Sequence, residues 1–137
     1  MSTRIIIENK INYIIRQIVL AQAYKKYSRP EIETNTEVRL IVERILYLIA
    51  QATIDLGEAI IAYRKFTKPT DQGDIFQILE EHDIIPRELM TKLIAMTGFR
   101  NVLAHGYTKI NYDRVYEVLH KDLKDVEEFI ELVKTVH

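Results

Sequence analysis

The chain has 137 residues, a length typical of one domain, and its 47% hydrophobic and 28% charged residues argue against disorder. It contains no cysteine, which excludes a disulfide scaffold and thiolate metal sites and fits a reducing cytoplasm. A formal net charge of -1 argues against a protein that coats nucleic acid through a basic excess, but not against an enzyme that contacts a few phosphates. We therefore expect one soluble domain over residues 1–137.

The N-terminal segment contains a short isoleucine run that charged and amide residues interrupt, from Glu8 to Arg16. These interruptions are too frequent for a signal peptide or a membrane span. We therefore expect a cytoplasmic protein with no membrane association.

Two long amphipathic helices are predicted in the first half of the chain. The first covers residues 3–27 and ends before Pro30, because proline disfavours helical geometry in the preceding residue. Thr34 and Glu37 form a capping-box pattern that starts the second helix, which continues to about residue 66. This helix would be roughly 40 Å long, and its apolar surface is broad. Both features suggest that its own bundle covers one side and a partner covers the other, and we therefore expect a homodimer. The predicted buried faces are Ile7, Ile11, Ile14, Ile15 and Ile18 in the first helix and Val38, Ile41, Val42, Ile45, Ile49, Ala52 and Leu56 in the second.

Three further helices are predicted after a polar turn at residues 70–73. The third covers residues 74–82. The fourth begins at Pro86, a residue suited to a first helical turn, and ends at Gly106. The last runs from Tyr112 or Asp113 toward the C-terminus, with an apolar face at the 3/4 spacing. No segment alternates with period two, so the fold class is all-α, an up-and-down bundle of four to five helices.

The most informative segment is GFRNVLAHGY, at the end of the predicted fourth helix. It places Arg100, four residues, His105, one residue and Tyr107 in order, with Asn101 after the arginine and Gly106 after the histidine. This pattern resembles the RX4HXY motif of HEPN-domain proteins in the HepT group. The order of the predicted helices is similar to that family over essentially the whole chain.

The resemblance implies a HEPN-like fold and a metal-independent endoribonuclease toxin, active as a homodimer whose two motifs line a shared cleft. Arg100 and His105 would be catalytic, with Asn101 and Gly106 supporting the motif. The resemblance also implies a type VII-like toxin–antitoxin pair, in which a minimal nucleotidyltransferase antitoxin neutralises the toxin by attaching AMP to Tyr107.

The residue types are also suited to RNA cleavage by their own chemistry. RNA supplies its own nucleophile, the 2'-hydroxyl, and cleavage then needs a base, an acid and positive charge on the phosphorane. Histidine titrates near neutral pH and serves as base or acid, while arginine offers charged donors to phosphate oxygens. Two protomers would supply a second copy of each group. No cofactor is expected.

The spacing of Arg100 and His105 leaves two geometric alternatives. Five residues on a regular helix turn ~500°, so the two side chains lie about 140° apart around the axis. Either the helix ends before His105, which Gly106 permits, or the pair meets across an interface between two copies. Tyr107 follows the glycine and is predicted on an exposed turn.

Plainer readings exist for the same residues. His105 suits a helix C-terminus, where it complements the helix dipole, Arg100 suits an ion pair with a neighbouring helix, and Tyr107 suits packing on the last helix. The consecutive residues Glu80 to Asp83 cannot converge on one metal ion.

Two other functional hypotheses therefore stay open. One is a non-catalytic dimeric subunit that binds a nucleotide or a nucleotidyltransferase partner, which the near-neutral charge and the broad apolar second helix favour. The other is a structural bundle in which the motif is coincidental.

Overall fold

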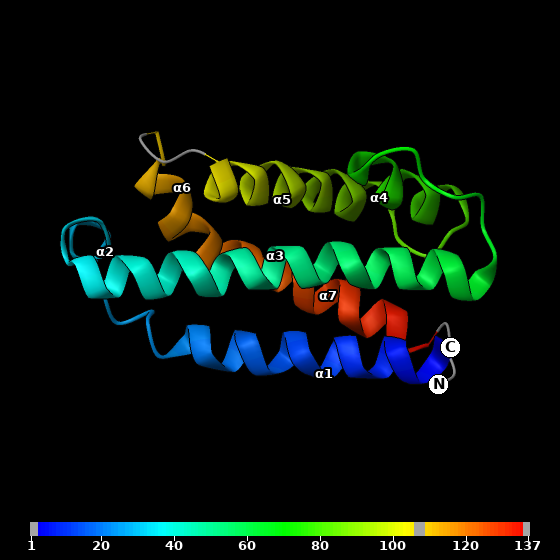
Figure 1. Ribbon diagram of the computed structural model, residues 1–137, viewed down its shortest axis with the longest axis horizontal. Helices are drawn as coiled ribbons and strands as arrows, with labels where there is room; N and C mark the ends of the chain where they lie inside the picture. Colours follow the sequence, from blue (N-terminus) through cyan, green and yellow to red (C-terminus); the bar gives the residue numbers. More distant parts are fainter. Residues whose placement is uncertain (1–2, 106–108, 136–137) are drawn as a thin grey trace.

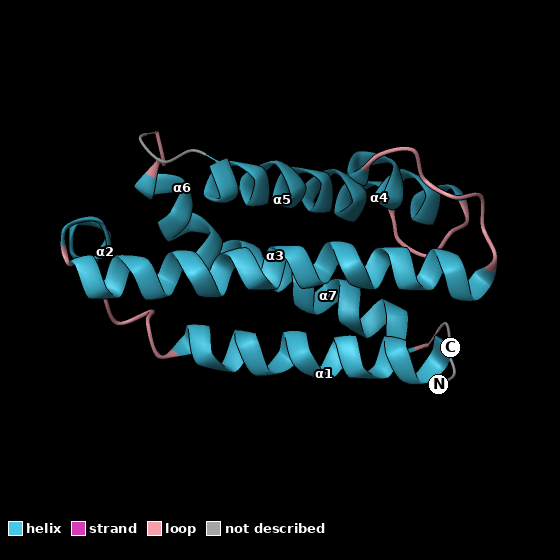
Figure 2. Ribbon diagram, viewed as in Figure 1, coloured by secondary structure: helices cyan, strands magenta, loops and turns pink. Residues whose placement is uncertain are grey.

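The computed structural model describes residues 3–105 and 109–135, and within these ranges it contains helices and no strand (Figure 1, Figure 2). This confirms the predicted all-α class. The elements are α1 (Thr3–Gln22), α2 (Arg29–Thr34), α3 (Thr36–Arg64), α4 (Gln72–Glu81), α5 (Arg87–His105), α6 (Tyr112–Glu117), a π-helical turn (Val118–Asp122) and α7 (Leu123–Lys134).

The long helix α3 is the centre of the bundle. It packs against α1, α2, α4 and α5, and α1, α3, α5 and α7 run in alternating directions, as an up-and-down bundle requires (Figure 1). Its 29 residues span about 43 Å at 1.5 Å per residue. By length and apolarity α3 could cross a membrane, but most of its apolar stretch is buried inside the bundle, as in the core helix of a globular domain.

The connection between α1 and α3 differs from the prediction. The first helix ends at Gln22 rather than near residue 27, and the short helix α2 follows. The capping box is formed by Ser28 and Glu31, with the Ser28 hydroxyl accepting from the Glu31 N–H at 3.2 Å and the Glu31 carboxylate accepting from the Ser28 N–H at 2.9 Å. The capping box predicted at Thr34 is wrong, because the Thr34 hydroxyl donates to the backbone of α2 and Asn35 caps α3 instead. Both segments carry the capping-box spacing, but only the first is followed by proline in the first turn.

The buried faces largely follow the predicted stripes, with two exceptions. Ile15 is 38% exposed and Ile41 is 41% exposed, whereas the other members of the two stripes are buried. Both exceptions sit beside a fully buried neighbour, Ile14 or Val42, and a helix turns by about 100° per residue. Only one residue of each adjacent pair therefore faces the core.

Glycine sets the distance between α3 and α4. Gly57 is buried, and a Cβ atom at this position would lie 2.6 Å from the Cγ2 methyl of Ile75. The missing side chain therefore allows α4 to lie directly against α3. Gly98 on α5 is different, because it is exposed and a Cβ there would have no heavy-atom neighbour within 4 Å in the described part of the chain.

The last predicted helix is interrupted by the π-helical turn. Val115, Val118, Leu119 and Leu123 are all buried across this turn. Residues spaced by four drift around a regular α-helix, and the wider π turn absorbs that drift. The ion pair between Arg114 and Asp122 spans the same turn.

Candidate functional site

The motif helix α5 continues through His105. The alternative in which the helix ends before the histidine is therefore wrong. On a regular helix the Arg100 and His105 side chains diverge by about 140°, so within one chain they leave α5 on different sides. The remaining alternative is that the pair meets across an interface between two copies.

Arg100 lies half-buried between α5 and α4. Its Nη2 donates a hydrogen bond to Oε1 of Gln72, the first residue of α4. Its Nε is buried and has no hydrogen-bond partner among residues 3–105 and 109–135. The plainer reading of Arg100 predicts an ion pair with a neighbouring helix. Its contact on α4 is a neutral amide instead.

His105 is exposed at the end of α5 and lines a surface groove of about 510 Å³. The opposite wall belongs to α3 and includes Leu40, Glu43, Arg44 and Tyr47. We call this surface the His105 groove. The Arg44 guanidinium lies 5.5 Å from the centre of the Tyr47 ring, within the range of a cation–π contact. The groove therefore places a histidine, a carboxylate and an arginine around a space open to solvent.

The start of α6 contacts the wall of the His105 groove. The hydroxyl of Tyr112, the first residue of α6, donates to the Glu43 carboxylate at 2.6 Å. Burial first, and the adjacent Glu43 carboxylate second, raise the pKa of Tyr112 to about 12. Tyr112 therefore remains a neutral donor at physiological pH.

The other predicted motif residues are placed only in part. Asn101 is exposed within α5, so it does not cap that helix. Gly106 and Tyr107 lie outside the described residues. The exposed turn predicted for Tyr107 stays a prediction.

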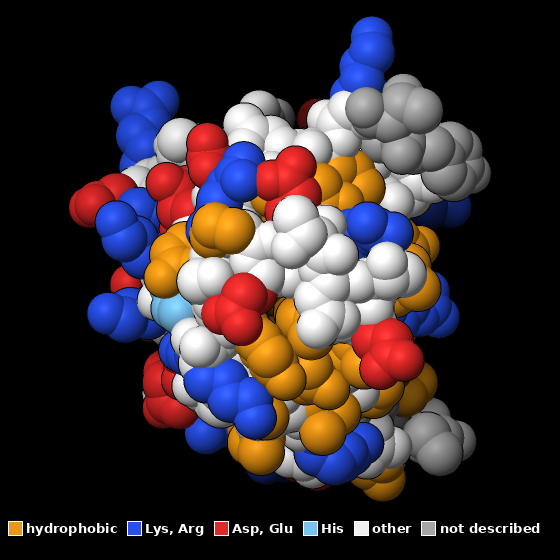
Figure 3. Space-filling model, turned by 90° about the vertical axis from the view of Figure 1, so that its left-hand side faces the viewer, with side chains coloured by type: hydrophobic (Ala, Val, Ile, Leu, Met, Phe, Trp, Pro, Cys, Tyr) orange, Lys and Arg blue, Asp and Glu red, His pale blue; other side chains and the backbone are white. Residues whose placement is uncertain are grey.

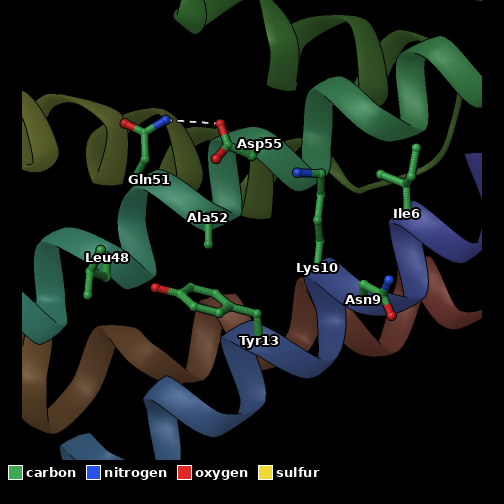
Figure 4. Close-up of a pocket in the computed structure, with 8 residues that line it drawn as sticks. All are labelled: Ile6, Asn9, Lys10, Tyr13, Leu48, Gln51, Ala52 and Asp55. Carbon is green, nitrogen blue, oxygen red and sulfur yellow. Dashed lines mark hydrogen bonds between the residues drawn. The ribbon is translucent and has the colours of Figure 1, made fainter.

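A second groove, between α1 and α3, contains no motif residue (Figure 4). It measures about 360 Å³ and is lined by Lys10 and Tyr13 from α1 and by Gln51 and Asp55 from α3. Figure 4 shows Lys10 reaching toward α3. Gln51 donates to Asp55 at 2.9 Å, so these polar groups satisfy each other on the helix surface. The groove lacks a histidine, and the candidate site remains at Arg100 and His105.

The charges on the surface are mixed. On the end of the molecule shown in Figure 3, basic and acidic side chains interleave around apolar patches. This agrees with the net charge of -1. In the part of the chain that the structure describes, no three His, Cys, Asp or Glu residues are grouped as metal ligands.

Comparison with known families identifies the chain. The family described as "Ribonuclease HepT-like" matches residues 14–133. This chain belongs to the HepT-like ribonuclease family. The resemblance to HEPN-domain HepT toxins is thereby confirmed.

Two relatives within this family are named nucleases. The chain is 31% identical over 130 residues to the mRNA nuclease HepT of Shewanella oneidensis, covering 94% of this chain and 96% of that protein. It is 30% identical over 112 residues to the tRNA nuclease HepT of Aphanizomenon flos-aquae, covering 82% and 76% of the two chains. The two names differ in the class of RNA.

Solved structures of toxin–antitoxin complexes contain chains with the same fold. The tri-AMPylated HEPN toxin of Shewanella oneidensis in complex with its MNT antitoxin has a TM-score of 0.87 and 29% identity, covering 95% of this chain and 97% of that chain. A toxin–antitoxin complex with AMP-PNP has a TM-score of 0.88 and 28% identity, over 95% and 98% of the two chains. These neighbours confirm the predicted HEPN-like bundle.

Proposed function

We propose that this protein is the endoribonuclease toxin of a cytoplasmic toxin–antitoxin pair and that it cleaves RNA with Arg100 and His105 at a cleft between two copies. The observation that carries the proposal is the divergence of these two side chains on an unbroken helix. One is held at α4 and the other opens onto the His105 groove. A second copy brings its own arginine and histidine to complete the constellation.

The proposed reaction needs no group beyond RNA and the protein. A histidine takes the proton of the ribose 2'-hydroxyl, the 2'-oxygen bonds to the adjacent phosphorus, and the bond from phosphorus to the 5'-oxygen breaks. The second histidine of the dimer protonates the departing 5'-oxygen, leaving a 2',3'-cyclic phosphate. Arg100 stabilises the charge of the phosphorane, and preorganised charge of this kind is often the largest catalytic contribution. The reaction is therefore metal-independent.

The dimer interface is proposed to lie beside the motif. Leu40 is 55% exposed on the wall of the His105 groove, and Val102 is 45% exposed on α5 three residues before His105. Large apolar side chains exposed near a functional motif can mark interaction surfaces. A second copy that covers both would bring the two motifs together.

The proposed partner is a minimal nucleotidyltransferase antitoxin. It would neutralise the toxin when the Tyr107 oxygen bonds to the α-phosphorus of ATP and pyrophosphate leaves. The proposal is supported by the similarity to an AMPylated toxin bound to its MNT antitoxin. It is also supported by the position of Tyr107 two residues after His105, where added phosphate would obstruct RNA.

The deciding experiment is cleavage of labelled total RNA by purified protein, shown by mass spectrometry to be unmodified, in the presence of EDTA. We expect cleavage with cyclic phosphate ends by the parent protein and none by Arg100→Ala or His105→Ala. If His105→Ala cleaves as well as the parent, the proposed mechanism is wrong. If none of the three cleaves any RNA class while the dimer is intact, the non-catalytic partner-binding subunit replaces the proposal.

A further inference from the structure

The positive charge of Arg100 is compensated differently from that of two other partly buried arginines in this fold. Arg29 contacts the carboxylates of Glu33 and Asp113, and Arg114 contacts those of Glu117 and Asp122. Each of these cations is compensated by two negative charges. Arg100 forms no ion pair within 4.0 Å with any residue that the structure describes, and its contact on α4 is the uncharged amide of Gln72.

The carboxylates on either side of Gln72 are occupied at the start of α4. Asp71 caps the helix, its Oδ1 accepting from the Asp74 N–H at 3.0 Å. Asp74 in turn accepts from the Thr70 N–H at 3.2 Å and from its hydroxyl. These hydrogen bonds hold the pKa of Asp74 below its ordinary value, the Thr70 hydroxyl contributing most. Gln72 is thus a neutral residue between two anions that serve the helix rather than Arg100.

The start of α4 is also a rigid support. Ile75, Phe76 and Leu79 on this helix are buried, and Phe76 meets Phe129 of α7 edge to face at 5.9 Å between ring centroids. A side chain held by a packed helix keeps its geometry more closely than one held by a loop. The backbone of Gln72 is therefore held in place relative to α5.

We propose that Gln72 is a positioning residue for RNA cleavage, holding the Arg100 guanidinium through an uncharged acceptor so that its positive charge stays available to the scissile phosphate. A carboxylate in the same place would bind the guanidinium more strongly and would compensate the charge that catalysis requires. The buried Nε of the same guanidinium has no hydrogen-bond partner among the described residues, so Gln72 is the contact that positions it. This inference rests on the proposed function. Gln72 acts through Arg100 and need not touch RNA itself.

Two substitutions of Gln72 separate its hydrogen bond to Arg100 from the effect of an added negative charge. Gln72→Glu keeps the acceptor and adds a negative charge, whereas Gln72→Met keeps the length and removes the acceptor. Gln77→Glu is the matched control, because Gln77 is exposed on the same helix and the change adds the same charge away from the Arg100 contact. All are assayed as intact full-length protein for kcat and KM on one labelled RNA, with thermal unfolding measured alongside.

We expect Gln72→Glu to lower kcat by about 10- to 100-fold, a smaller loss than removal of a direct oxyanion donor, while its melting temperature stays equal or rises. Gln72→Met should also lower kcat, and Gln77→Glu should match the parent. A merely structural role for Gln72 would instead leave Gln72→Glu fully active, because the hydrogen bond to Arg100 survives.

The outcomes separate this inference from the proposed function. If Arg100→Ala is inactive but both Gln72 variants cleave at the parental rate, the positioning role is refuted and the ribonuclease proposal stands. If Arg100→Ala itself cleaves at the parental rate, the role of the arginine fails and the positioning role fails with it. If Gln72→Glu does not fold, the Gln72→Met result decides, and parental kcat in that variant overturns the inference.

Discussion

The contact between α3 and α4 at Gly57 allows a quantitative test of the packing. In Gly57→Ala the new methyl would lie 2.6 Å from Ile75 Cγ2, 3.5 Å from Phe76 Cε1 and 3.7 Å from Leu79 Cδ1. Ile75 is 1% exposed, and its branched Cβ restricts χ1 to essentially one rotamer in a helix. The methyl cannot be accommodated by rotating Ile75, so the two helices must separate.

Two opposing contributions determine the size of the effect. Replacing glycine by alanine inside a helix gains about 1 kcal/mol of helix propensity. Overpacking a well-packed core costs about 1–3 kcal/mol. Gly57→Ala should therefore lower the free energy of unfolding by roughly 0–2 kcal/mol.

Gly98→Ala isolates the contact contribution. It gains the same helix propensity, and its added methyl meets no described atom within 4 Å. The difference between the two variants therefore equals the overpacking cost, about 1–3 kcal/mol. At about 4 °C per kcal/mol for a chain of this size, the two melting temperatures should differ by about 4–12 °C.

The assay is thermal unfolding followed by circular dichroism, with all proteins at one concentration because the melting temperature of a dimer depends on concentration. We expect Gly98→Ala to melt above the parent and Gly57→Ala to melt below Gly98→Ala by the stated interval. Equal increases for the two variants would refute the reasoning, since they would mean that α4 moves away from α3 at no cost.

Two further predictions concern the surroundings of the motif. Because folding raises the pKa of Tyr112 from 10.0 to about 12, the stability that its hydroxyl contributes is complete below pH 10 and is lost as the pH rises toward 12. In urea unfolding Tyr112→Phe should be less stable than the parent at pH 8, with the gap narrowing above pH 10; a constant gap would exclude the hydrogen bond to Glu43 as its cause. If the proposed dimer forms at the His105 groove, Leu40→Asp should be monomeric in light scattering and should not cleave RNA. Val19→Asp, at an exposed position of α1, should leave both properties unchanged. A dimeric, active Leu40→Asp would place the interface away from the His105 groove.

The sequence predicts best what depends on local periodicity. The apolar face of the last helix, from Val115 to Val133, is buried as predicted, because a single stripe at the 3/4 spacing leaves one way to pack. Spacing alone does not select the position of the capping box, since SRPE and TNTE both satisfy it. The choice between them depends on where α1 ends.

Contacts between distant residues carry no signal in a single sequence. Gln72 reaches Arg100 across 28 positions and Tyr112 reaches Glu43 across 69, and no pattern in the chain pairs them. A polar residue at the first position of a helix has many possible partners, and only the packing of that helix selects one. The motif residues could therefore be predicted, but the groups that hold Arg100 and line the His105 groove could not.

The central place of α3 also determines how the molecule opens. Ile49 and Ala50, in the middle of this helix, are fully buried beneath the surrounding helices, so we expect their amide hydrogens to exchange with solvent only when the whole domain unfolds. The last turns of α5 are different, because Asn101, Val102 and His105 are exposed there and their amides exchange through local opening. We therefore expect the last turn of α5, where the motif lies, to open locally while the core of the bundle stays closed.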